Sequence, residues 1–136
     1  MRYIKNNLFI DNKGIFDLAN KYGTPLYCYS YNKLKSNIDR FKNSFKKISP
    51  LICFSVKSNS NISLLKEIKK LGLGADVVSK GELFAALKAG INKKKIVFSG
   101  VGKTAEEIDY AIKKNILLIN AESHNEVLVI EKIAKK

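Results

Sequence analysis

Lys57 and Asp76 are the two residues of this 136-residue sequence whose type and position could support chemistry. The apolar run Leu51 to Val56 predicts a strand, and alternation along it directs Lys57 to the face that also carries Cys53 and Ser55, at the carboxyl end. A lysine held there away from water has a lowered pKa, and its amine can condense with a carbonyl group. Position alone is equally compatible with a lysine that extends from a strand end into solvent.

Asp76 lies one residue into the next predicted strand, Ala75 to Val78, where both faces are normally buried. A buried carboxylate needs a cation or several hydrogen-bond donors, and Lys57 on the neighbouring strand is a candidate. The alternative is an aspartate that caps the turn at residues 72–74. We favour the pair, because it accounts for both residues.

Four short apolar runs, each followed by a turn and an amphipathic helix, position these two residues. The runs begin at residues 51, 75, 96 and 117, about 21 to 24 residues apart, which is typical of the βα units of a parallel sheet. The pattern S/T-x-x-E marks the start of three of the helices, because the two side chains can cap each other's backbone N–H groups. The three pairs are Ser79 with Glu82, Thr104 with Glu107, and Ser123 with Glu126.

Four successive βα units suit either a (β/α)8 barrel or a doubly wound sheet, and the even spacing favours the barrel. A complete barrel needs roughly 250 residues. The sequence therefore predicts an α/β fold in which residues 49–136 are the first half of a barrel. Residues 1–48 are expected to lead into it, with a helix over Ile15 to Tyr22, a strand over Leu26 to Tyr29 and a longer helix over Tyr31 to Phe45.

The net charge of +13, from 25 Lys and Arg against 12 Asp and Glu, raises the question of a nucleic-acid partner. Only Arg2 and Arg40 are arginines, however, and many lysines lie near predicted helix C-termini, where cations are stabilising. Nucleic-acid readers concentrate arginine and aromatic side chains on one face. No apolar run approaches the ~20 residues that a membrane span needs. We expect a cytoplasmic protein with neither a nucleic-acid nor a membrane partner.

Other candidate sites are weaker. Cys28 and Cys53 fit no metal-ligand spacing and are predicted to be buried free thiols, and the single His124 belongs to a predicted helix start, so we expect no metal site. The segment Gly100 to Thr104 ends like a phosphate-binding loop but has Val97 where that loop needs its first glycine. The pair Gly72 and Gly74 precedes a strand and lacks the third glycine of a dinucleotide-binding turn.

Four segments carry a family resemblance. They are Gly23-Thr24-Pro25-Leu26-Tyr27, Phe54-Ser55-Val56-Lys57-Ser58-Asn59, Gly72 to Ser79 with Gly81-Glu82-Leu83, and Phe98 to Thr104. In this order they resemble the amino-terminal part of diaminopimelate decarboxylases, which are fold-type III, pyridoxal-phosphate-dependent decarboxylases with an alanine racemase-type barrel. The resemblance covers nearly the whole chain.

The resemblance implies a (β/α)8 barrel with a second β domain, a homodimer, and removal of CO2 from meso-2,6-diaminopimelate to give L-lysine, the last step of lysine biosynthesis. Lys57 matches the lysine that binds pyridoxal 5'-phosphate covalently, Asp76 matches an aspartate beside that bond, and Asn59 belongs to the same cofactor-binding motif. The family chain is roughly three times as long, so we expect this chain alone to be inactive. The alternatives are an ornithine or arginine decarboxylase, a non-catalytic relic, and a pyridoxal-phosphate-binding module.

Overall fold

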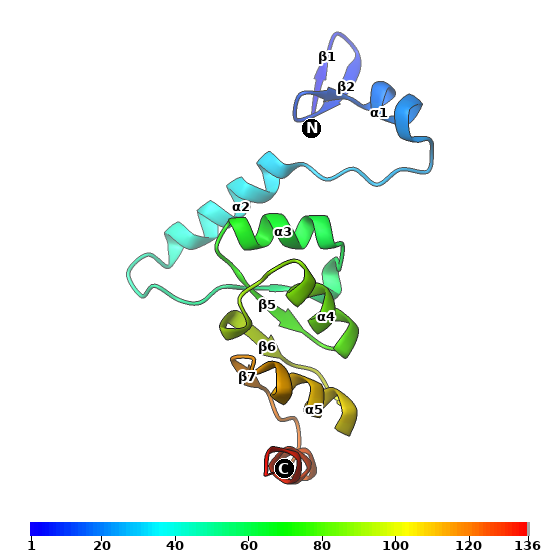
Figure 1. Ribbon diagram of the computed structural model, residues 1–136. Helices are drawn as coiled ribbons and strands as arrows, with labels where there is room; N and C mark the ends of the chain where they lie inside the picture. The colour runs from blue at the N-terminus through cyan, green and yellow to red at the C-terminus, as the bar shows by residue number, and fades with distance from the viewer. Residues whose placement is uncertain (136) are drawn as a thin grey trace. The chain divides into compact units, whose positions relative to one another are not determined.

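The computed structural model describes residues 1–135, which form two compact units, Met1–Ile48 and a second unit that begins at Ser49 (Figure 1). The first unit is a three-stranded antiparallel sheet followed by two helices. Its elements are β1 (Arg2–Ile4), β2 (Asn7–Ile10), β3 (Lys13–Gly14), α1 (Ile15–Tyr22) and α2 (Tyr31–Ser44). Both predicted helices are confirmed.

One prediction for the first unit is wrong, because no strand forms over residues 26–29. The hairpin of β1 and β2 was not predicted from the sequence, and its strands pair through a tight turn at Lys5 and Asn6. Both turn residues have positive φ, 45° and 60°, as the common two-residue hairpin turn requires. Asp11 follows β2 and accepts a hydrogen bond from Ser30 Oγ at 2.5 Å, which lowers the pKa of the Asp11 carboxyl.

The second unit confirms the four predicted βα units and the α/β class. Its strands are parallel and lie in chain order (Figure 1). The elements are β4 (Cys53–Ser55), the 3-10 turn η1 (Val56–Ser58), α3 (Ile62–Lys70), β5 (Gly74–Val77), α4 (Lys80–Lys88), η2 (Lys93–Lys95), β6 (Ile96–Phe98), α5 (Ala105–Lys114), β7 (Leu118–Ile119) and α6 (His124–Ala134). Strands β4, β6 and β7 are shorter than the apolar runs that predicted them, whereas β5 has the predicted length and begins one residue earlier.

The parallel sheet has one apolar face and one smaller, more polar face. On the apolar face Ala75 pairs in register with Ile96, and Val77 with Phe98, and all four side chains are 0% exposed. Helix residues that are equally buried pack with them: Leu65, Ile68, Leu83, Ala86, Ile108 and Ala111. The opposite face carries Cys53, Ser55, Asp76, Val97 and Leu118, which are half-buried or exposed. The described core therefore lies between the sheet and its helices.

Gly74 is required by a close backbone approach at the start of β5. A Cβ atom at this position would lie 2.1 Å from the Lys95 carbonyl oxygen and 2.9 Å from Cys53 Sγ. Because a backbone oxygen cannot swing aside as a long side chain can, no larger residue fits without moving β6 away from β5.

The predicted capping pairs form, in two variants. Thr104 and Glu107 make the reciprocal capping box at α5. At α4 and α6 the serine accepts the glutamate N–H, but the glutamate carboxylate instead accepts the backbone N–H of the residue before the cap, Val78 or Glu122. Each variant satisfies N–H groups that the first helical turn leaves without partners.

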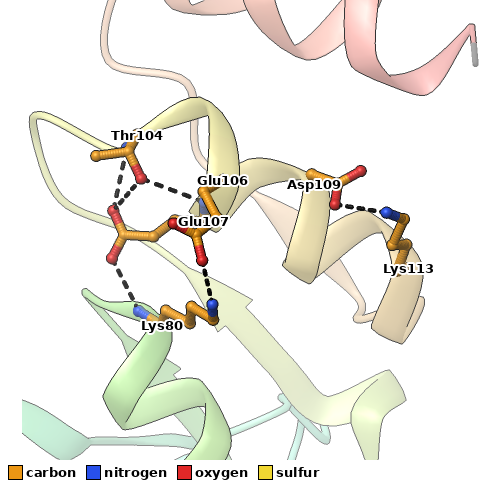
Figure 2. Close-up of polar contacts among 6 residues, drawn as sticks. All are labelled: Lys80, Thr104, Glu106, Glu107, Asp109 and Lys113. Atoms are coloured by element: carbon orange, nitrogen blue, oxygen red, sulfur yellow. Dashed lines mark hydrogen bonds and ion pairs between the residues drawn. The ribbon is translucent and has the colours of Figure 1, made fainter.

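Glu107 also joins two helices (Figure 2). Its Oε2 accepts the backbone N–H and the hydroxyl of Thr104, both at 3.0 Å, while its Oε1 accepts the backbone N–H of Lys80 at 2.9 Å. Lys80 Nζ pairs in addition with Glu106. The N–H groups of Thr104 and Lys80 lower the pKa of the Glu107 carboxyl, so this carboxylate ties the starts of α4 and α5 together.

Candidate active site

Lys57 lies in the turn η1, directly after β4, rather than within the strand. The turn is fixed by a hydrogen bond from the Asn59 N–H to the Val56 carbonyl at 3.0 Å and by Ser58 Oγ to the Ser55 carbonyl at 2.7 Å. Val56 is fully buried and anchors the turn, while Lys57 is exposed. Lys57 is therefore not shielded from water as expected, because it lies in the turn beyond the end of β4.

Asp76 is the register partner of Ser55, so the predicted adjacency of the two strands is confirmed. The predicted ion pair with Lys57 is wrong. Within residues 1–135 no salt bridge joins the two side chains, and Asp76 Oδ1 instead accepts a hydrogen bond from Ser99 Oγ at 2.6 Å. Ser99 directly follows β6, and its hydroxyl reaches Asp76 on the neighbouring strand β5.

The sequence analysis missed Ser99 and Asn120. Asn120 directly follows β7, and its Nδ2 donates to Ser99 Oγ at 3.0 Å. A signal for both was present, because Asp76, Ser99 and Asn120 recur at nearly the spacing of the βα repeat, and Ser99 and Asn120 fall near the carboxyl ends of predicted strands. At those ends the neighbouring strands of a parallel sheet bring such residues together.

Asn59 stabilises the turn that leads into α3. Its Oδ1 accepts the Asn61 N–H at 3.0 Å, and Asn61 in turn caps the helix by accepting the Ser63 N–H at 2.8 Å. The Nδ2 group of Asn59 has no hydrogen-bond partner among residues 1–135, so one amide donor stays available beside Lys57.

The two cysteines differ. Both are free, as predicted, but Cys28 is exposed and Cys53 is half-buried, so the prediction of two buried thiols is wrong. Cys53 Sγ donates to the Lys95 carbonyl at 3.7 Å. Burial, and after it the Asp76 carboxylate, raise the pKa of the Cys53 thiol. The polar face of the sheet is therefore an environment in which a thiol stays protonated.

Comparison with known proteins identifies the family. Residues 31–136 match the family model described as pyridoxal-dependent decarboxylase, pyridoxal binding domain. The chain belongs to the pyridoxal-dependent decarboxylases. It is 50% identical over 119 residues to diaminopimelate decarboxylase of Helicobacter pylori strain J99, covering 88% of this chain and 29% of the relative. It is 43% identical over 136 residues to the enzyme of that name from Aquifex aeolicus, covering 100% of this chain and 32% of the relative.

A solved structure shows the same arrangement. Diaminopimelate decarboxylase from M. jannaschii in complex with L-lysine superposes with a TM-score of 0.93 at 39% identity, covering 96% of this chain and 32% of that one. The parallel sheet and this likeness confirm the partial barrel. The chain thus spans about a third of the relatives it matches.

The described residues of this family member fit the aldehyde end of the family's cofactor. Lys57 offers a primary amine with no ion-pair or hydrogen-bond partner in residues 1–135, and the free Nδ2 of Asn59 lies in the same segment. Asp76 Oδ2 also has no described partner. At these adjoining strand ends the amine could capture an aldehyde, the amide could donate to an oxygen, and the carboxylate would favour a protonated nitrogen.

The same residues do not provide for the cofactor's phosphate. Helix N-termini are the usual anion sites, but glutamate side chains already bond N–H groups at the starts of α4, α5 and α6. A carboxylate there repels a second anion. The described residues also hold no group of three or more His, Cys, Asp or Glu suited to a metal ion, and none of their helices has the length and apolar character of a membrane span.

Proposed function

We propose that this chain carries the cofactor-binding lysine of a diaminopimelate decarboxylase, which converts meso-2,6-diaminopimelate to L-lysine and CO2. One observation carries the proposal: Lys57 presents a free amine at the carboxyl end of β4, beside the strand that holds Asp76, in a chain of this family. The names of the relatives and the L-lysine bound to the M. jannaschii enzyme support the substrate.

The roles of the residues follow from their chemistry. Pyridoxal phosphate, when bound, supplies an electron sink for the electron pair that loss of CO2 leaves behind. Lys57 provides the nucleophilic amine that holds the aldehyde carbon in place. Asp76 favours the protonated form of a nitrogen bound there, because a nearby carboxylate stabilises a cation. Asn59 Nδ2 donates a hydrogen bond to an oxygen of the bound group.

Residues 49–136 form, in this proposal, the first half of the cofactor-binding barrel, and residues 1–48 lead into it. The chain alone is inactive, because it spans about a third of its relatives and leaves one face of the sheet open. The whole enzyme is a cytoplasmic homodimer that acts on a small amino acid and has no nucleic-acid or membrane partner.

A chimera tests the activity. Residues 1–136 replace the matching third of the Aquifex aeolicus enzyme, and CO2 release is measured from meso-diaminopimelate, ornithine and arginine. We expect release from meso-diaminopimelate, none in the Lys57→Ala chimera, and full release in the Lys66→Ala chimera, since Lys66 is an exposed lysine of α3. Release that survives Lys57→Ala contradicts the assignment of Lys57. A preference for ornithine or arginine contradicts the substrate.

The chain itself tests the covalent step. It is incubated with pyridoxal phosphate, reduced with borohydride, and digested for peptide mass mapping. We expect the label at Lys57 in preference to the other lysines, and no CO2 release. Equal labelling of many exposed lysines contradicts a specific binding site at Lys57. Labelling at Lys57 combined with an inactive chimera identifies a cofactor-binding module in place of a decarboxylase.

A further inference from the structure

A chain of three polar side chains crosses the carboxyl ends of β5, β6 and β7. Asn120 Nδ2 lies 3.0 Å from Ser99 Oγ, which lies 2.6 Å from Asp76 Oδ1. The direction of donation is fixed by the chemistry of the groups. A carboxylate only accepts, so the single hydroxyl proton of Ser99 goes to Asp76, and Ser99 must accept from the Asn120 amide.

The backbone holds both donors in place although they lie just beyond their strands. The Ser99 N–H bonds the Val77 carbonyl, and the Asn120 N–H bonds the Phe98 carbonyl, each at 2.8 Å. The ladder of the sheet therefore continues through these residues. Their side chains leave from fixed backbone positions, which lowers the entropic cost of keeping the hydrogen-bond chain formed.

The chain of bonds fixes the orientation of the Asp76 carboxylate. Oδ1 is occupied by Ser99, while Oδ2 has no partner among residues 1–135 and is the oxygen left for a group bound at Lys57. A carboxylate without the Ser99 bond would rotate about its side-chain torsions and would present either oxygen.

We propose that Ser99 and Asn120 are positioning residues, which hold Asp76 so that its free oxygen faces an aldehyde-bearing ligand captured by Lys57. The proposal rests on the proposed function, because it assumes that Lys57 captures such a ligand. It assigns no contact with that ligand to Ser99 or Asn120, which act through Asp76.

The first test uses the chain without any ligand. The side-chain amide of Asn120 is followed by 15N NMR in the wild-type chain and in Asp76→Ala. Asp76 lies on β5 and Asn120 directly follows β7, with β6 between them, so the hydrogen-bond chain connects the Asp76 acceptor to Asn120 through the Ser99 hydroxyl. We expect the Asn120 side-chain signals to shift in Asp76→Ala and in Ser99→Ala. Unchanged Asn120 signals in Asp76→Ala overturn the hydrogen-bond chain.

The second test measures the rate at which pyridoxal phosphate labels Lys57, trapped with borohydride. We expect Ser99→Ala to slow labelling about tenfold, the kinetic equivalent of one hydrogen bond to a charged group. Ser99→Thr keeps the hydroxyl and should restore most of the rate. Asp76→Ala should slow labelling as much as Ser99→Ala, and the double variant no further, because both changes remove the same oriented carboxylate.

Two variants at Asn120 keep the test decisive if Ser99→Ala does not fold, since Asn120 is exposed. Asn120→Ala removes one donor and should slow labelling about threefold. Asn120→Asp should slow it more, because the Ser99 proton is then shared between two carboxylates. A wild-type chain without label at Lys57 overturns the proposed function. Label that forms at the wild-type rate in folded Ser99→Ala, or in both Asn120 variants, overturns the positioning role.

Discussion

Replacement of Lys103 by methionine should destabilise the chain more than any other loss of a single charge described here. Lys103 Nζ lies 2.8 Å from Glu126 Oε1, and the two side chains are 1% and 10% exposed. Lys103 also donates to the Gly100 carbonyl at 2.5 Å. The pair therefore fastens the loop after β6 to the first turn of α6, with almost no contact with water.

The expected cost follows from what Glu126 loses. Its Oε2 keeps the Glu122 N–H, but its buried Oε1 has no hydrogen bond and only Lys103 as a partner among the described residues. Removing one member of a buried pair costs about 3–5 kcal/mol. Protonation of Glu126 would remove the unpaired buried charge, and it costs about 3.7 kcal/mol at pH 7 for a carboxyl of ordinary pKa. We expect a loss of about 3 kcal/mol at pH 7.

The Lys103–Glu126 pair also makes the free energy of unfolding depend on pH. Burial acts to raise the pKa of Glu126, but Lys103 and the Glu122 N–H outweigh it, so the pKa in the folded wild-type chain is lowered. The pair thus contributes stability above the ordinary glutamate pKa of about 4.3 and loses it as the pH falls through the lower folded value. At pH 5 protonation in Lys103→Met costs only about 1 kcal/mol, so the destabilisation should shrink to that size.

Urea unfolding followed by circular dichroism measures both numbers. A loss of 3 kcal/mol shifts the midpoint by about 1 to 3 M. Lys113→Met is the matched control, because its ion pair with Asp109 in α5 is 2.7 Å long but 72% and 41% exposed (Figure 2). It should cost less than about 0.5 kcal/mol. A Lys103→Met loss as small as that of Lys113→Met, or equal at pH 5 and pH 7, would refute the reasoning.

Three further predictions concern the sheet and its helix starts. Glu107→Gln should cost about 1 kcal/mol at pH 7 in urea unfolding and progressively less as the pH is lowered below the ordinary glutamate range, because the lowered pKa of Glu107 makes its stabilisation disappear as the pH falls through the folded value. Gly74→Ala should lower stability by about 2–3 kcal/mol through overpacking against backbone, whereas Gly81→Ala, with no atom closer than 3.8 Å to its Cβ, should be neutral or stabilising by up to about 1 kcal/mol, which thermal unfolding checks. Asp76→Asn should lower the raised pKa of the Cys53 thiol, measured as the pH dependence of its alkylation rate with the exposed cysteine replaced by serine; an unchanged or higher pKa would contradict the contribution of the Asp76 charge.

The parts of the fold that the sequence predicts are those set by local chemistry. The capping pairs depend only on a few neighbouring residues. The repeat of apolar runs predicts the parallel order, because each helix returns the chain to the same edge of the sheet. The hairpin of β1 and β2 was missed because three or four residues give too short an alternation to recognise.

The site was predicted only in part, for a different reason. The neighbours Ser55 and Asp76 follow from the order of the strands, but the partner of Asp76 depends on the register between β5 and β6. That register places Ser99 within reach of Asp76, whereas Lys57 lies in the turn beyond the end of β4. An error of one residue in the predicted strand end was sufficient to assign Asp76 the wrong partner, because each step along a strand reverses the face.

The two faces of the sheet separate stability from chemistry. The face toward the helices is fully covered on the two central strands, since Ala75, Val77, Ile96 and Phe98 are all fully buried. The opposite face is half-buried or exposed, and it holds Asp76 near the carboxyl end of β5, with Lys57 in the turn just beyond β4. Substitutions of the buried side chains on the first face should therefore lower the free energy of unfolding, while substitutions of Asp76, Ser99 and Asn120 should mainly change the reactivity of Lys57. This separation makes covalent labelling of the 136-residue chain a meaningful experiment even though decarboxylation requires the rest of the barrel.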